Sequence, residues 1–179
     1  MAANHNSHLD TLVLMALVPL HQIDRVRPVG AREYFHRNGL CRWLSNHLLG
    51  LIPISRGQRC HRGVLEPCGE ALAKGDTLLL FPEGSRGRPE ELGCLKAGVA
   101  QLSMQHPTVD VTPVWMRGCG RALPKGEALL VPSFCDIVVG ERMPKVEGRD
   151  GRTARKEWMG ELEERFLSLA SELPENGWS

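Results

Sequence analysis

His5 and Asp10 are residues whose types and spacing suit proton-transfer chemistry, and they lie in a polar run at residues 4–10. Five residues on a regular helix advance by about 500°, so the two side chains could not meet if both were helical. We therefore expect a helix that begins after His5, with Ser7 or Asn6 at its N-cap, so that Asp10 reaches back to the imidazole. A carboxylate on one ring nitrogen orients a histidine to take a proton from a substrate hydroxyl with the other.

Two other interpretations of this run are open. Ser7-x-x-Asp10 is also the pattern of a capping box, in which the histidines would simply be solvated. His5, His8 and Asp10 could instead begin the ligand set of a zinc hydrolase, because imidazole and carboxylate are proper zinc ligands. A later cluster of His or Cys with matching spacing would have to complete that set, and the sequence has none.

A second segment could bind an anion. It reads Pro82-Glu83-Gly84-Ser85-Arg86 and follows an apolar run that predicts a central strand. Proline ends the strand, Gly84 permits a close backbone approach or a positive φ, and Glu83 and Arg86 place a carboxylate beside a fork of donors. The alternative is a surface turn with a casual ion pair, since charged turns rich in glycine and proline are common.

Arg56 also follows a short apolar run, at residues 50–55, which predicts another strand. Ligands of open α/β sheets bind at the carboxyl ends of the strands. We therefore expect Arg56 and Arg86 to converge on one anion, where a guanidinium adds two-pronged contact to its charge.

Composition frames these segments as parts of one globular domain, residues 1–179, with 42% hydrophobic and 24% charged residues. A net charge of +1 argues against a nucleic-acid binder, which usually carries a strong basic excess. The six cysteines form no C-x-x-C pair, so we expect free thiols. The longest strongly apolar run, residues 12–20, is too short to cross a bilayer, so any membrane contact should be peripheral.

Strands and helices are predicted to alternate, which indicates an α/β fold with a mixed central sheet flanked by helices. Helical spacing or apolar content predicts helices at 11–20, which should be buried on all sides, and at 31–49, 64–74, 92–105 and 152–173. Strands are expected at 25–30, 50–57, 77–81, 109–116 and within 128–139. Pro113 should place its strand at an edge or a bulge, and Lys96 should lie near the start of its helix. The last helix should bury Trp158, Leu162, Phe166, Leu169 and Leu173.

Four of these segments together resemble the motifs of the glycerolipid acyltransferase family, in the same order along the chain. They are Asn4-His5-x4-Asp10, Ile52-Pro53-Ile54-Ser55-Arg56, Phe81-Pro82-Glu83-Gly84-Ser85-Arg86 and Val111-Thr112-Pro113-Val114. The similarity covers residues 4–140, and the lysophosphatidic acid acyltransferase type matches best. Four ordered signals are far more specific than any one of them. Only three residues precede Asn4, which leaves open whether the first strand of that fold is present.

The resemblance implies a function and a set of site residues. His5 would be the general base on a glycerol hydroxyl and Asp10 its orienting partner. The acyl donor would be acyl-CoA or acyl-ACP, and no metal or redox cofactor is implied. Residues implied to bind substrate, chiefly the phosphate of a lysophospholipid, are Arg56, Glu83, Gly84, Ser85, Arg86 and Lys96.

The same resemblance implies a peripheral enzyme of phospholipid biosynthesis at the cytoplasmic, inner face of a membrane. Pro53, Ser55 and Ser85 stand where the family often has other residues, which affects the choice of substrate more than the class of reaction. A catalytically inactive lipid-binding module is the alternative from another class, and an intact pair of His5 and Asp10 argues against it.

Overall fold

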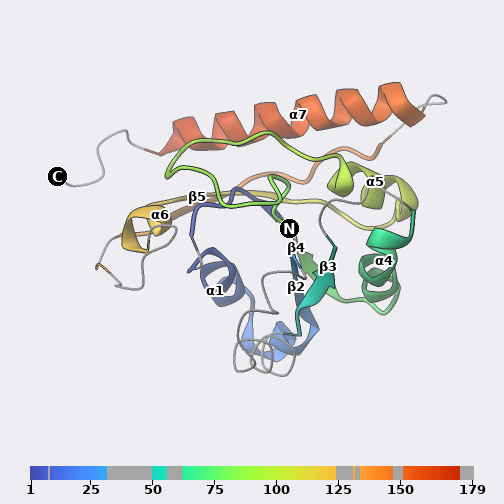
Figure 1. Cartoon of the computed structure of the whole chain (residues 1–179), viewed down its shortest axis with the longest axis horizontal. Coiled ribbons are helices and arrows are strands. Elements are labelled where there is room, and N and C mark those ends of the chain that lie inside the picture. Colours follow the sequence, from blue (N-terminus) through green and yellow to red (C-terminus); the bar gives the residue numbers. More distant parts are fainter. Residues whose placement is uncertain are drawn as a thin grey trace.

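The computed structural model describes residues 1–7, 9–31, 50–55, 62–123, 131, 134–146 and 151–173. Helices and strands alternate along these ranges (Figure 1). In chain order the elements are β1 (Ala2–Ala3), α1 (Leu9–Ala16), η1 (Leu20–Arg25), β2 (Val26–Ala31), β3 (Ile52–Ile54), η2 (Arg62–Leu65), α4 (Glu66–Ala73), β4 (Thr77–Leu79), α5 (Gly98–Gln105), β5 (Pro113–Arg117), α6 (Cys119–Ala122), β6 (Asp136–Val139) and α7 (Gly151–Glu172).

Two three-stranded sheets meet at β1. One has the order β3-β2-β4 and the other β1-β5-β6. A parallel bridge between Ala2 and Leu80 joins them, with Leu80 N–H bonding the Met1 carbonyl and Ala3 N–H bonding the Leu80 carbonyl, both at 2.9 Å. Every pairing is parallel except that of β5 with β6. The predicted mixed α/β fold is confirmed, and the residues just before Asn4 do form a strand, at the junction of the two sheets.

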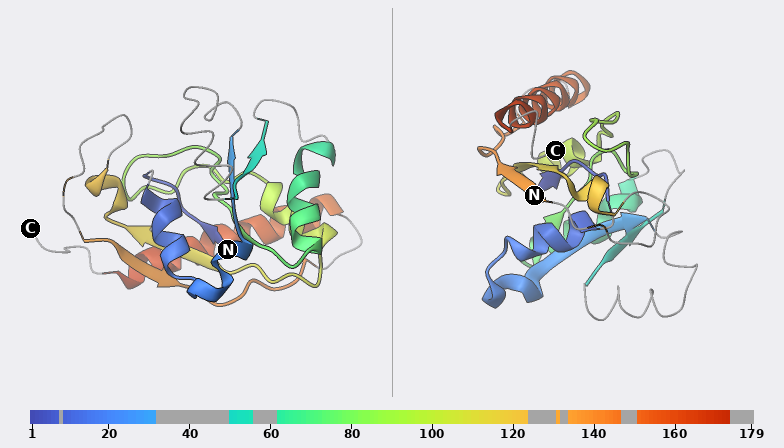
Figure 2. Two further views of the ribbon diagram at one scale, coloured as in Figure 1. Left: turned by 90° about the horizontal axis from the view of Figure 1, so that it is seen from below. Right: turned by 90° about the vertical axis from the view of Figure 1, so that its left-hand side faces the viewer.

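Helices cover the two faces of the β1-β5-β6 sheet. Figures 1 and 2 show α7 on one face and α1 on the other. Because successive side chains of a strand point to opposite faces, Trp115 packs toward α7 whereas Val114 and Met116 pack toward α1. Four of the five predicted apolar positions of α7 are buried, and Leu162 and Phe166 are fully inaccessible, whereas Leu173 follows the helix and is only half-buried. Strand β5 is therefore packed on both faces of its sheet.

The helix after His5 is not buried on all sides. It ends at Ala16, and its buried positions are Asp10 and Leu14. Leu12 is 53% exposed, and beyond the helix Leu17 is 41% exposed and Leu20 87% exposed. Apolar composition all round predicted full burial, but only one face of α1 has a sheet to pack against.

Two further predictions are wrong in informative ways. The helix predicted at 92–105 begins only at Gly98, so Lys96 lies just before α5. Residues 91–96 form an irregular segment that bonds the turn after β4: Gly93 N–H donates to Glu83 and Lys96 N–H donates to the Pro82 carbonyl. Strand β5 is the central strand of its sheet, not an edge. Pro113 is tolerated there because it is the first residue of the strand.

Other predictions match within a few residues or lie outside the described chain. Strands β2 and β4 and helix α4 occur where expected, and β6 covers the described end of the 128–139 segment. Ala31, the first residue of the helix predicted at 31–49, instead ends strand β2, and residues 32–49 and Arg56 lie outside the described residues. The described cysteines are free thiols, as expected, and they are Cys68, Cys94, Cys119 and Cys135.

Candidate active site

His5 and Asp10 meet in the loop between β1 and α1. The Nδ1 atom of His5 lies 2.9 Å from Oδ2 of Asp10. The same oxygen accepts the backbone N–H groups of Asn6 at 2.7 Å and Ser7 at 2.8 Å. The carboxylate thus accepts the Ser7 N–H, as in a capping box, and also contacts the imidazole, so His5 is not simply solvated as the capping interpretation required. With Nδ1 used in this way, Nε2 is the ring nitrogen left for a substrate proton.

The side chains of His5 and Asp10 differ in how deeply they are buried. The Asp10 side chain is 1% exposed, whereas that of His5 is 19% exposed. A buried carboxylate needs donors around it, and Asp10 has three on one oxygen. The imidazole therefore stands between a buried anion and the surface, which is the arrangement of an oriented base.

Asn4 anchors the start of the loop to the sheet. Its side chain accepts the Met116 N–H at 2.7 Å and donates to the Met116 carbonyl at 2.8 Å. Asn4 is 1% exposed. Its side chain thus extends the pairing of β1 with β5 by one residue past the end of β1. Asn4 belongs to the motif Asn4-His5-x4-Asp10, but its residue type alone indicates no role.

The ring and backbone of His5 are held from the turn after β4. Phe81 stacks on the imidazole with ring centroids 4.0 Å apart and planes 20° from parallel. Gly87 N–H donates to the His5 carbonyl at 2.9 Å, and His5 N–H donates to Oε1 of Glu83 at 2.8 Å. The turn that sequence analysis assigned to the anion thus also fixes the position of the histidine.

Glu83 is a buried carboxylate, 5% exposed, whose second oxygen accepts Gly93 N–H at 3.0 Å. Burial raises the pKa of Glu83, and its two backbone hydrogen bonds and the nearby His5 only partly oppose this. A Cβ at Gly93 would lie 2.6 Å from Oε2 of Glu83, so a larger residue there would require the carboxylate to shift. No sequence signal pointed to Gly93.

The remaining predicted substrate residues of the described chain surround this turn. Gly84 has φ +69°, as its residue type suggested, and a Cβ there would lie 2.5 Å from Nζ of Lys96. The ammonium of Lys96 therefore lies directly over the backbone of the turn. Ser85 and Lys96 are exposed and Arg86, which precedes the Gly87 amide bonded to His5, is half-buried. Two cationic side chains thus flank the turn that holds the histidine.

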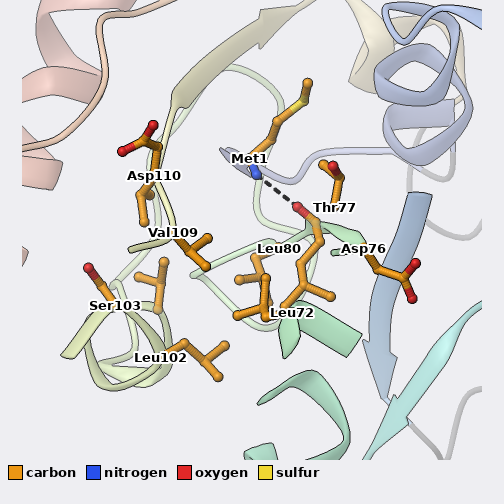
Figure 3. Close-up of a pocket in the computed structure, with 12 residues that line it drawn as sticks. Met1, Leu72, Asp76, Thr77, Leu80, Leu102, Ser103, Val109 and Asp110 are labelled. Carbon is orange, nitrogen blue, oxygen red and sulfur yellow. Dashed lines mark hydrogen bonds between the residues drawn. The ribbon is translucent and has the colours of Figure 1, made fainter. Parts of the chain in front are cut away.

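A pocket elsewhere is unrelated to these residues. It lies at the amino ends of β1 and β4, where Met1 and Thr77 line it, and the terminal ammonium of Met1 donates to the Leu78 carbonyl at 2.8 Å (Figure 3). His5 and Glu83 follow the opposite, carboxyl ends of the same strands. The candidate site is therefore at the strand ends that α/β folds use for ligands.

The part of the chain that the structure describes contains neither a cluster of potential metal ligands nor a helix that could span a membrane. No three potential His, Cys, Asp or Glu ligands gather in one place within it. None of its helices is long and apolar enough to cross a bilayer.

The chain is similar to known acyltransferases. Residues 1–117 match the model of the family described as Acyltransferase. The chain is 27% identical over 130 residues to a chloroplastic 1-acyl-sn-glycerol-3-phosphate acyltransferase of Arabidopsis thaliana, which covers 69% of this chain and 33% of that protein. It is 32% identical over 108 residues to a 1-acyl-sn-glycerol-3-phosphate acyltransferase of Chlamydomonas reinhardtii, covering 59% and 32%. The matches thus span about a third of the length of these relatives.

The fold is also similar to a solved structure. The crystal structure of PlsC, the 1-acyl-sn-glycerophosphate (LPA) acyltransferase from Thermotoga maritima, aligns with a TM-score of 0.74 at 21% identity. The alignment covers 99% of this chain and 66% of that chain. At this identity the likeness establishes the fold.

Proposed function

The chain belongs to the Acyltransferase family, and from that premise we propose that it transfers a fatty acyl group from a thioester to the free hydroxyl of a lysophospholipid such as 1-acyl-sn-glycerol-3-phosphate. The observation that carries the proposal is the 2.9 Å contact between Nδ1 of His5 and the buried carboxylate of Asp10. The names of the relatives support the acceptor class.

The proposed reaction needs no covalent enzyme intermediate. Nε2 of His5 takes the proton of the acceptor hydroxyl as its oxygen attacks the carbonyl carbon of the thioester. The tetrahedral intermediate collapses, the C–S bond breaks, and the departing thiolate recovers the proton from the imidazolium. Asp10 stabilises that imidazolium and fixes the tautomer. Acyl-CoA or acyl-ACP supplies the acyl group, and positioning of the two substrates provides the remainder of the rate enhancement.

The acceptor's phosphate is assigned to the turn after β4 and its neighbours. Arg86 and Lys96 supply charge, and Gly84 lets the phosphate approach the backbone, as its positive φ and missing side chain allow. Arg56, which follows β3 in the sequence, is proposed to join them. Glu83 is better placed to support the site than to touch an anion, because both of its oxygens already accept backbone N–H groups.

Peripheral contact with a membrane is part of the proposal, since the acceptor is a lipid. Three leucines around α1 support it, because exposed aliphatic side chains grouped on one segment favour a lipid or protein surface. They are Leu12, Leu17 and Leu20. This segment begins immediately after the proposed active-site loop, so contact there would bring a bilayer close to His5.

The decisive experiment incubates the purified chain with a panel of acyl-CoA and acyl-ACP donors and of lysophospholipid acceptors. Mass spectrometry then identifies any new diacyl product. We expect product from a lysophosphatidic acid acceptor, and none from the same panel with the His5→Ala variant. Absence of product with every donor and acceptor would contradict the proposed function, and binding of lysolipid without turnover would favour an inactive lipid-binding module.

A further inference from the structure

Phe81 lies face to face with the imidazole of His5. The ring centroids are 4.0 Å apart and the planes are 20° from parallel. Two neutral aromatic rings prefer an offset or edge-to-face arrangement with centroids about 4.5 to 7 Å apart, because their electron-rich faces repel each other. A cation over the face of an aromatic ring is attracted to it instead. The observed stack therefore suits a protonated imidazole better than a neutral one.

Phe81 is held in this place by contacts that do not involve His5. Leu80, the residue before it, forms the bridge between the two sheets. The Phe81 carbonyl accepts the Gly84 N–H at 2.9 Å. The side chain packs against the hydrophobic cluster that contains Leu14 and Leu79. The phenyl ring thus presents a fixed face to the imidazole.

The contact of Nδ1 with Asp10 does not by itself fix the plane of the imidazole. A ring held by one in-plane hydrogen bond can still tilt about the line of that bond, and the tilt moves Nε2. Contact of a whole ring face with Phe81 opposes the tilt, because the imidazole plane must stay close to that of the phenyl ring. The hydrogen bond and the stack together therefore set the direction of Nε2, the nitrogen left for the acceptor hydroxyl.

We propose that Phe81 is a positioning residue whose ring aims the imidazole of His5 and stabilises the imidazolium that forms when Nε2 takes a proton. This assignment rests on the proposed role of His5 as the base. Asp10 stabilises the same cation from the edge of the ring, whereas Phe81 does so from its face and adds no charge. Phe81 thus acts through His5 and needs no contact with substrate.

Two kinds of change at position 81 test this. Phe81→Leu removes the aromatic face but keeps an apolar side chain against the same cluster. Phenylalanines with one, two or three fluorine atoms on the ring keep its shape and progressively withdraw electrons from its face. Asp10 and Glu83, the ionisable groups bonded to His5, are unchanged throughout.

Phe166→Leu is the matched control. Phe166 is fully buried, lies in the separate cluster under α7 and contacts the ring of Trp115. The control therefore loses an aromatic ring from the core without changing the stack on His5. Thermal melting shows the temperature range in which each variant is folded, and the fluorinated series provides the test even if Phe81→Leu does not fold.

Steady-state kinetics measure the effect on catalysis. We expect Phe81→Leu to lower kcat about two- to thirtyfold, the range of a cation–π contact, with KM for both substrates little changed. In the fluorinated series kcat should fall stepwise with the number of fluorine atoms. Phe166→Leu should leave kcat unchanged. A kcat that is the same throughout the fluorinated series would overturn the inference, and so would a loss in Phe81→Leu that is confined to KM.

NMR titration of the His5 ring reports on the contact without any turnover. The titration midpoint should be lower in Phe81→Leu by about 0.4 to 1.5 pH units and should fall stepwise in the fluorinated series. The ring protons of His5 should also lose the upfield shift that a stacked phenyl ring causes. These changes support the inference even if the assay detects no acyl transfer, which would count only against the proposed function. A wild-type midpoint throughout the fluorinated series would overturn the inference.

Discussion

Oε1 of Glu83 accepts the backbone N–H of His5 at 2.8 Å, although the two residues are 78 positions apart in the sequence. The other oxygen of Glu83 accepts Gly93 N–H. One buried carboxylate thus fastens the proposed base to the turn after β4 and to the segment that leads to α5. Several expected effects of substitution depend on this link or on the contact of His5 with Asp10.

Replacing His5 with alanine should reduce turnover by about 10² to 10⁴, the usual contribution of a general base. Asp10→Asn should also be severe, because an amide cannot stabilise the imidazolium and can enforce the wrong tautomer. The His21→Ala variant is the control, since His21 is exposed in η1. Steady-state rates at saturating substrates give the comparison, with thermal melting to confirm folding. Losses at His8→Ala as large as those at His5→Ala would favour a zinc site.

Glu83→Gln should destabilise the protein by about 1 to 3 kcal/mol, because the amide –NH₂ of glutamine must face one of the two backbone N–H donors. Turnover should fall as well, since the backbone of His5 loses its support. Urea unfolding measures the first effect and acyl transfer the second. An unchanged midpoint of unfolding would show that the two hydrogen bonds contribute no net stability.

The stability difference between the wild type and Glu83→Gln should depend on pH in a definite direction. The folded-state pKa of Glu83 is raised above its ordinary value of 4.5. A raised pKa adds stability that is complete below pH 4.5 and is lost as the pH rises through the folded-state value. Glutamine does not titrate, so its stability gains nothing at low pH. The amount by which Glu83→Gln is less stable than the wild type should therefore shrink as the pH rises from 4.5 through the folded-state pKa of Glu83. A deficit that grows with pH would mean that the hydrogen bonds to the ionised carboxylate outweigh its burial.

Arg86→Lys keeps the charge but loses the forked geometry, so it should weaken use of the acceptor by about 1.5 to 3 kcal/mol. Lys96→Ala should act in the same direction, because its ammonium lies over Gly84. Arg88→Lys is a close control, since its side chain is 83% exposed in the same loop. Steady-state kinetics in which the acceptor and the donor are varied separately show which of the two substrates these cations bind. A higher donor KM with an unchanged acceptor KM would assign these cations to the donor's phosphates.

Serine at Leu12, Leu17 and Leu20 together should weaken binding to phospholipid vesicles, measured by co-sedimentation. Leu167→Ser is the control, because Leu167 is 54% exposed on α7, away from the proposed active-site loop. Transfer to a dispersed short-chain acceptor should be little affected, since none of the leucines belongs to the proposed catalytic pair. Equal vesicle binding by the triple variant and the wild type would exclude this face as the membrane contact.

Sequence patterns predicted those features that depend on neighbours along the chain. The apolar stripe of α7 repeats every three or four residues, and the contact of His5 with Asp10 follows from where a helix can begin. Features set by distant contacts were missed. Strand β5 is central because β1 and β6 both pair with it, and residues 91–96 avoid helix because Glu83 and Pro82 take their amides.

The partners of the site were missed for the same reason. Asn4 bonds Met116 and Ser7 bonds the Leu123 carbonyl, each across more than 100 residues of chain, and neither contact leaves a local pattern. The positive φ of Gly84 was expected from its type, because only backbone preference was involved. Local chemistry is thus readable from the sequence, whereas the groups that hold it in place are not.

The junction of the two sheets at β1 has a consequence for inactivation. Ala2 and Ala3 are paired on both sides and fully buried, and Asn4 and His5 follow at once. Buried segments with protected backbone bonds open at a free energy close to that of the whole fold, as amide hydrogen exchange detects. Displacement of His5 therefore requires the two sheets to separate. Heating or mild denaturant should abolish catalysis together with helical circular dichroism, with the Ala3 and Leu80 amides among the last to exchange.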